Sequence, residues 1–171
     1  MLCYDIRSLE SRAVQVDDEL PTDDPVWLEG DSLPSGNITV EGRLSAAGPG
    51  RFYFSGTVAG GVVVACRRCL ADAAAAVTED ANFLYAEPGV EGDADDDPDV
   101  YALDSRAREL DLRPAIREQW LLISPAYALC RPDCKGLCKQ CGADLNEGPC
   151  GCAVSTDRHS DGLRDAPPVA E

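Results

Sequence analysis

Eight of the nine cysteines in this sequence fall into groups whose spacing could hold metal ions. Six lie in the stretch CRPDCKGLCKQCGADLNEGPCGC, from Cys130 to Cys152, and two more form the motif CRRC at Cys66 and Cys69. Cysteine thiolates bind zinc tetrahedrally, and a C-x-x-C turn directs two of them at one ion. The glycine that follows CKQC suits such a turn because it adopts positive φ without strain. The sequence therefore predicts two four-cysteine sites, each for one structural zinc ion, and leaves Cys3 outside them.

Two ways of dividing these cysteines between the sites stay open. In the first, one site is local and consists of Cys138, Cys141, Cys150 and Cys152, whereas the other joins Cys66, Cys69, Cys130 and Cys134. In the second, the two C-x-x-C motifs share one ion and the remaining four cysteines bind the other. We favour the first arrangement because it closes one site within a short loop, which costs little chain entropy.

The residue types favour closed structural sites over a catalytic centre. A catalytic zinc keeps one coordination position open and usually takes histidine or a carboxylate, but the one histidine, His159, lies outside the cysteine-rich stretch. A redox role for CRRC, which would need a helix N-terminus to lower a thiol pKa, and an iron–sulfur cluster are the alternatives. Residues 130–152 offer few large apolar side chains, chiefly Leu137 and Leu145, so a metal must stabilise their fold. We expect no catalytic residues and a protein that is not an enzyme.

Basic residues are interspersed with the cysteines. They could neutralise the negative charge of thiolate-bound zinc, or form a small face that contacts RNA phosphate or another partner; they are Arg67, Arg68, Arg131, Lys135 and Lys139. The chain as a whole has 31 acidic residues against 15 basic ones and a net charge of −16. Such a charge argues against strong non-specific binding of nucleic acid. It reflects either the composition of the source proteome or a surface that receives a basic partner.

The elements that position CRRC read as strands. Residues 37–44 and 51–58 alternate apolar and polar side chains, as half-buried strands do. The β-branched run at 62–66 ends at Cys66, and a further strand is predicted from near Ala75. CRRCL then forms the turn of a hairpin between two strands.

One helix is clear in the sequence, over residues 111–123 (DLRPAIREQWLLI). Asp111 is placed to cap it, and Pro114 falls in its first turn, where a missing N–H costs little. An apolar stripe along one side predicts packing on the sheet, and its members are Leu112, Ile116, Trp120 and Ile123. The expected fold class is α+β: an antiparallel, partly barrel-like sheet with one main helix and a zinc-stabilised C-terminal module.

The chain divides into four predicted parts. These are an N-terminal strand and acidic arm (1–35), a sheet-plus-helix core (36–129) with an acidic loop at 87–99, the cysteine-rich zinc module (130–152), and a disordered tail (153–171). Within the first part, VDDELPTDDP reads as a loop. No apolar run is long enough to span a membrane and no secretory signal opens the chain. We therefore expect a cytoplasmic protein with reduced thiols and no membrane partner; its oligomeric state does not follow from the sequence.

These motifs together resemble one family. CRRCL after a β-run, then DLRPAIREQWLLISPAYALC, then CRPDCKGLCKQCGADLN with a trailing CGC, resemble the YceD family of large ribosomal RNA subunit accumulation proteins, in order over about residues 36–152. The resemblance implies a non-enzymatic ribosome-biogenesis factor that supports accumulation of large-subunit rRNA or assembly of the subunit. Its implied partners are large-subunit rRNA or a pre-ribosomal particle. The alternatives are an acidic holdase for a basic ribosomal protein and, less favoured, a thiol redox protein that uses the C-x-x-C motifs.

Overall fold

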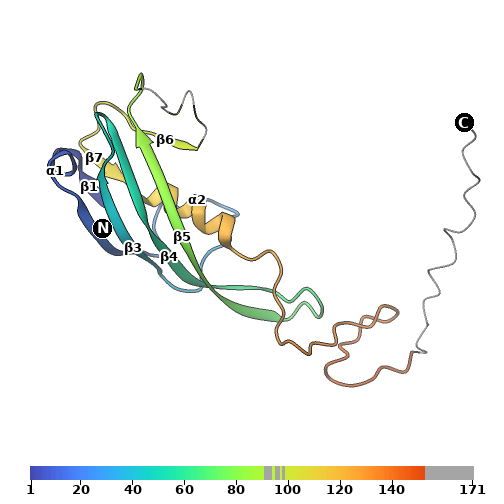
Figure 1. The fold of residues 1–171 in the computed structure, drawn as a ribbon. Coiled ribbons are helices and arrows are strands. Elements are labelled where there is room, and N and C mark those ends of the chain that lie inside the picture. Colours follow the sequence, from blue (N-terminus) through green and yellow to red (C-terminus); the bar gives the residue numbers. More distant parts are fainter. Residues whose placement is uncertain (91–93, 95–96, 98, 153–171) are drawn as a thin grey trace, which may run out of the picture.

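The body of the protein is a five-stranded sheet. The computed structural model describes residues 1–90, 94, 97 and 99–152. In spatial order the strands are β2 (Val14–Leu20), β3 (Ile38–Ala46), β4 (Arg51–Ala65), β5 (Asp72–Ala86) and β6 (Val100–Ala102) (Figure 1). Neighbours from β2 to β5 pair antiparallel, and only β6 runs parallel to its neighbour. The predicted antiparallel sheet is therefore confirmed in its main part, but it stays open, and the described residues form no closed barrel.

Two helices and a small second sheet complete the α+β fold. Helix α1 (Ile6–Ser11) follows β1 (Cys3–Asp5), which pairs antiparallel with β7 (Glu109–Asp111). Helix α2 (Arg113–Ile123) starts directly after β7. The backbone N–H of Leu112 donates to the carbonyl of Leu2 at 2.9 Å, so the start of α2 is tied to the N-terminal segment.

The apolar stripe of α2 packs on the sheet as predicted. Leu112, Ile116 and Trp120 are fully buried in the main core. The indole ring of Trp120 lies over Gly60 of β4, where an added Cβ would come within 2.9 Å of the ring. The indole N–H donates to the carbonyl of Ser32 at 2.9 Å. Helix and sheet therefore make close contact at a position that only glycine can occupy without displacing the ring.

The start of α2 differs slightly from the prediction. Asp111 is the last residue of β7, so the N-cap residue is Leu112. The side chain of Leu112 is apolar and makes no capping bond. The Asp111 carboxylate still accepts from the backbone N–H of Arg113 at 3.0 Å and binds its guanidinium. Pro114 lies in the first turn, as expected.

The prediction of a loop at the start of VDDELPTDDP is wrong for its first residues. Residues 14–20 form β2, with Val16 and Leu20 buried and the acidic residues between them exposed or half-buried. The alternation of apolar and acidic residues has the period of a strand, and pairing with β3 orients the charges toward solvent. The density of acidic residues obscured this period in the sequence.

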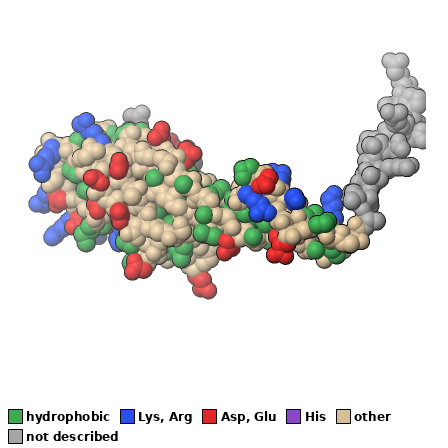
Figure 2. Space-filling view, turned by 90° about the horizontal axis from the view of Figure 1, so that it is seen from below, with side chains coloured by type: hydrophobic (Ala, Val, Ile, Leu, Met, Phe, Trp, Pro, Cys, Tyr) green, Lys and Arg blue, Asp and Glu red, His purple; other side chains and the backbone are tan. Residues whose placement is uncertain are grey.

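Strands β4 and β5 continue beyond the rest of the sheet as a two-stranded arm. Their pairing runs without interruption from Arg51↔Ala86 to Ala65↔Asp72, whereas β3 leaves β4 after Ala59. Residues 66–71 form the turn, so the predicted hairpin at CRRCL is confirmed. Figures 1 and 2 show that this arm leads from the broad body to the narrower cysteine-rich segment at the far end of the molecule.

Two predicted segments fall wholly or partly outside the described residues. They are the tail at 153–171 and most of the acidic stretch between Val90 and Asp99. Within the described part of the chain, no helix is both long enough and apolar enough to cross a membrane.

Candidate metal centres

The structure brings eight cysteine sulfurs into two groups of four. Within each group all four Sγ atoms lie within 4.8 Å of one another. The proximal tetrad is Cys66, Cys69, Cys130 and Cys134, and the distal tetrad is Cys138, Cys141, Cys150 and Cys152. This is the first of the two divisions considered from the sequence. The remaining cysteine, Cys3, lies in β1 and belongs to neither group.

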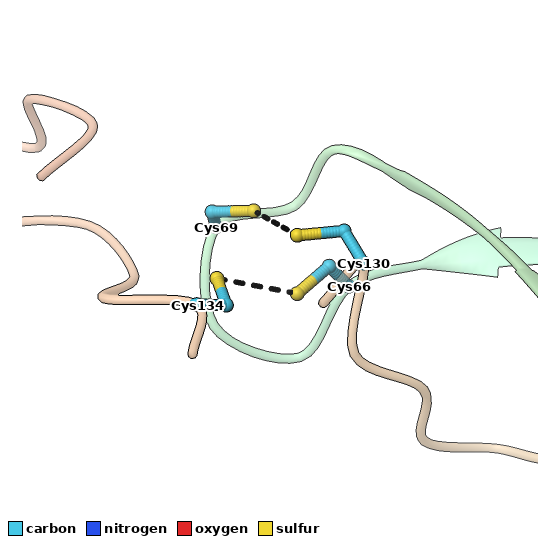
Figure 3. Close-up of side chains that lie close together, drawn as sticks. All are labelled: Cys66, Cys69, Cys130 and Cys134. Atoms are coloured by element: carbon cyan, nitrogen blue, oxygen red, sulfur yellow. Dashed lines mark hydrogen bonds between the residues drawn. The ribbon is translucent and has the colours of Figure 1, made fainter. Parts of the chain in front are cut away.

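The proximal tetrad joins distant parts of the chain. Cys66 and Cys69 come from the β4–β5 turn, and Cys130 and Cys134 come from the segment after α2 (Figure 3). The Sγ atoms of Cys66 and Cys134 are 3.8 Å apart, and those of Cys69 and Cys130 are 3.6 Å apart. Zn–S bonds of about 2.3 Å in a tetrahedron place two sulfurs about 3.8 Å apart. The sulfur spacing therefore fits four thiolates around one metal ion.

The two C-x-x-C turns share one backbone geometry. In the first, the N–H of Leu70 donates to the carbonyl of Cys66 at 2.9 Å; in the second, the N–H of Gly142 donates to the carbonyl of Cys138 at 2.9 Å. A second bond closes each turn: the N–H of Cys66 donates to the carbonyl of Ala71 at 2.7 Å, and the N–H of Cys138 donates to the carbonyl of Ala143 at 2.8 Å. The residue after the second cysteine has positive φ in both, 63° for Leu70 and 73° for Gly142. Leu70 thus adopts a conformation that usually selects glycine.

Backbone N–H groups lower the pKa of the first cysteine in each motif. Backbone N–H groups of Cys130, Cys69 and Arg68 lower the pKa of Cys66 to about 6. The N–H groups of Cys141 and Gln140 do the same for Cys138, also to about 6. Hydrogen bonds to a thiolate favour its charged form, which is the form that binds metal.

One other cysteine of each tetrad behaves in the opposite way. The thiol of Cys69 and burial raise the pKa of Cys130 to about 12, and the thiol of Cys141 raises that of Cys152 to about 12. Four adjacent thiols cannot all ionise without a cation, because each thiolate repels the next. Each tetrad thus combines one readily ionised cysteine with another whose ionisation needs the positive charge of a metal.

Asn146, which the sequence analysis did not single out, supports the proximal tetrad. Its Nδ2 donates to Cys134 Sγ at 3.5 Å, and its Oδ1 accepts from the backbone N–H of Lys135 at 2.8 Å. Burial opposes ionisation of Cys134, but Asn146 and the N–H of Gly136 outweigh it and lower the pKa of this thiol. Asn146 lies in the loop that closes the distal tetrad, so this side chain connects the two sites. The DLN sequence, typical of an Asx turn, was the available signal.

The backbone also links the cysteine-rich segment to the hairpin. The N–H of Arg67 donates to the carbonyl of Ala128 at 3.0 Å, and the N–H of Leu137 donates to the carbonyl of Arg68 at 3.0 Å. Gly136, with φ of 77°, passes so close to Arg68 that an added Cβ would lie 2.9 Å from its carbonyl oxygen. A metal ion in the proximal tetrad would therefore fasten the segment after α2 to the tip of the arm.

Both tetrads have four cysteine ligands, which is typical of closed structural sites. CRRC lies in a strand-to-strand turn, whereas a thioredoxin-like motif lies at a helix N-terminus. The five basic residues predicted for partner contact are all exposed and flank the tetrads. Some of them also make contacts within the protein: Arg68 Nη1 donates to the carbonyl of Cys134 at 2.8 Å, and Arg131 Nε lies 3.7 Å from the carboxylate of Asp133.

A comparison with family models matches residues 54–165 to the model described as "Large ribosomal RNA subunit accumulation protein YceD". This match covers more than half of the chain and includes every cysteine of both tetrads. The chain belongs to the YceD family. The family description links its members to large-subunit rRNA and names no reaction.

Similar curated proteins add no further functional description. Uncharacterized proteins of Mycobacterium bovis and Mycobacterium tuberculosis are 35% identical over 97 residues, which cover 56% of this YceD-family chain. The matched region covers 45% of the length of each of these relatives. No solved structure matches the chain.

Proposed function

We propose that this protein is a non-enzymatic assembly factor that contacts large-subunit rRNA, in the cytoplasm, through the basic side chains around two structural zinc ions. Family membership supports the link to large-subunit rRNA. The observation that carries the site is the presence of five exposed basic residues around the tetrads of a strongly acidic molecule. Figure 2 shows Lys and Arg side chains on the narrow segment that holds the tetrads.

Zinc is the ion that best fits the donor set. Four thiolates in a tetrahedral arrangement select zinc or iron among biological metals. The short Sγ–Sγ distances of 3.6 and 3.8 Å suit one ion rather than a cluster, since several irons would hold their thiolates farther apart. In this proposal the ions act by fixing the basic residues in place, and the chemistry of the thiolates is not used.

The acidic body limits how RNA is bound. Repulsion between carboxylates and phosphates disfavours broad non-specific contact, so RNA contact would be confined to exposed basic side chains such as those around the tetrads. Guanidinium and ammonium groups there would orient the protein on its target through phosphate contacts. Binding is therefore expected to be weak in isolation and sensitive to salt.

The test is complementation of a depletion strain. Depletion should lower the ratio of large to small subunits on sucrose gradients, and the wild-type protein should sediment with large-subunit precursors. A variant with Arg67, Arg131 and Lys135 changed to glutamate should fail to restore the ratio and should lose crosslinks to rRNA in cells. The matched control reverses Arg7, Arg106 and Arg108, which line a cleft away from the tetrads. Normal subunit ratios after depletion, or equal loss of crosslinks in both variants, would contradict the proposal.

A further inference from the structure

Strand β5 has a long outer edge without a strand partner. It pairs with β4 over its whole length, but with β6 only from Leu84 to Ala86. Within residues 1–90, 94, 97 and 99–152, no backbone hydrogen bond reaches its outer side between residues 72 and 83. An edge of this length is a template for another extended chain.

The register shows which backbone groups face outward. At one end of the β4–β5 ladder the N–H of Cys66 donates to the carbonyl of Ala71, and at the other end the N–H of Glu87 donates to the carbonyl of Gly50. Between these two bonded pairs, hydrogen-bonded and non-bonded pairs alternate along the ladder, as in any antiparallel pair. Odd-numbered residues of β5 therefore bond to β4, whereas even-numbered residues direct their N–H and C=O groups away from it. Ala86 agrees with this assignment, because its carbonyl accepts from Leu103 on the outer side at 2.8 Å. The outward-facing residues of the unpaired stretch are Ala74, Ala76, Thr78, Asp80 and Asn82, all of them exposed.

The charge along this edge is negative. Strand β5 has the sequence DAAAAVTEDANFLYA, with three acidic residues and no basic one. The edge ends at a cavity of about 470 Å³ between β5, β6 and α2, whose lining includes the acidic residues Asp99 and Glu118 and the exposed Leu122. A chain added beside β5 would reach this cavity at the point where β6 begins. Small side chains at Ala74 and Ala76 leave room for its approach.

From these observations we infer that the outer edge of β5 binds an extended, basic segment of a protein partner as an added strand. The backbone of β5 supplies the hydrogen bonds, and the acidic residues of the edge and cavity select lysine or arginine side chains. A second copy of the same chain is disfavoured because it would bring like charges together. RNA is disfavoured for the same reason, so this surface differs in chemistry from the basic side chains around the tetrads.

The test uses the full-length, metal-loaded protein and a labelled peptide of about 12 residues, the length of the unpaired edge, in which lysine alternates with threonine and valine. Fluorescence anisotropy should show saturable binding that weakens as salt rises. The same peptide with alternate amides N-methylated should bind at least about tenfold more weakly, since it cannot donate to β5. This comparison leaves the protein unchanged and so does not depend on the folding of a variant.

Ala76→Pro removes one outward N–H while keeping the bonds to β4, and it should weaken peptide binding by about tenfold. Thr78→Ala is the matched control: it changes an exposed side chain on the same edge, leaves the backbone donors in place, and should alter binding by less than about twofold. Equal binding of the N-methylated peptide, or of Ala76→Pro with an unchanged melting curve, overturns the inference. So does direct binding of a labelled mixed-sequence RNA oligonucleotide that Ala76→Pro abolishes, or a self-association of the protein that Ala76→Pro abolishes.

Discussion

Replacing Asn146 with alanine should weaken metal binding at the proximal tetrad although Asn146 is not a ligand. The side chain makes two bonds that matter there: Nδ2 to Cys134 Sγ at 3.5 Å and Oδ1 from Lys135 N–H at 2.8 Å. A neutral hydrogen bond is worth about a factor of five in an equilibrium constant, and a bond to a charged sulfur about tenfold or more. The product lies in the range of about 10–100-fold that is typical of outer-sphere partners of metal ligands.

A chelator competition at neutral pH measures this effect. The wild-type protein should release its two ions at similar chelator concentrations or in two steps. Asn146→Ala should lower, by the predicted factor, the chelator concentration at which the ion of the proximal tetrad is released. The control is Glu147→Ala, which removes an exposed side chain from the same loop. Since Asn146 lies in the distal loop, a shift confined to the distal tetrad would refute the coupling inferred from its contacts. The loaded site can be identified by which cysteines resist alkylation.

Three further predictions concern the ions and the core. Cys150→Ser should release about one metal ion per chain and leave the proximal tetrad loaded, as native mass spectrometry would show; loss of both ions would favour a shared arrangement. Metal affinity should fall with acidification. The slope of log affinity against pH should steepen by about one proton per site below about pH 6, because the pKa values of Cys66 and Cys138 are about 6 and metal binding must then displace their protons. A pH-independent slope in competition titrations would disprove this. Gly60→Ala should lower the free energy of unfolding in urea by about 1–3 kcal/mol through contact with Trp120, whereas Gly36→Ala, with open space around it, should change it by less than about 0.5 kcal/mol.

The parts of the fold that the sequence predicted depend on local spacing. The C-x-x-C turns, the hairpin at CRRCL and the stripe of α2 each follow from residues within a few positions of one another. Strand β2 was missed because its acidic residues resemble a loop, and its assignment depends on pairing with β3 far along the chain. The short strands β6 and β7 likewise exist only through their partners.

The same distinction applies to the candidate sites. Cysteine spacing suggested the correct grouping of sulfurs, because one tetrad closes locally. The role of Asn146 could not be predicted, since its contact with Cys134 depends on how one loop folds back on another. The unpaired edge of β5 could not be predicted either, because the sequence does not show that only three residues of β6 pair with β5.

The two tetrads differ greatly in the chain length that each must close. Cys66 and Cys134 are 68 positions apart, whereas the distal cysteines all lie between residues 138 and 152. Closing a long loop is entropically costly until the intervening elements have formed. The distal tetrad could therefore bind a metal ion on a chain that is still largely unfolded. The proximal tetrad could bind one only after the β4–β5 hairpin and the segment after α2 have come together. If both tetrads bind metal, binding of the second ion would require the folded hairpin and helix, and metal shortage would leave the cysteine-rich segment detached from the arm.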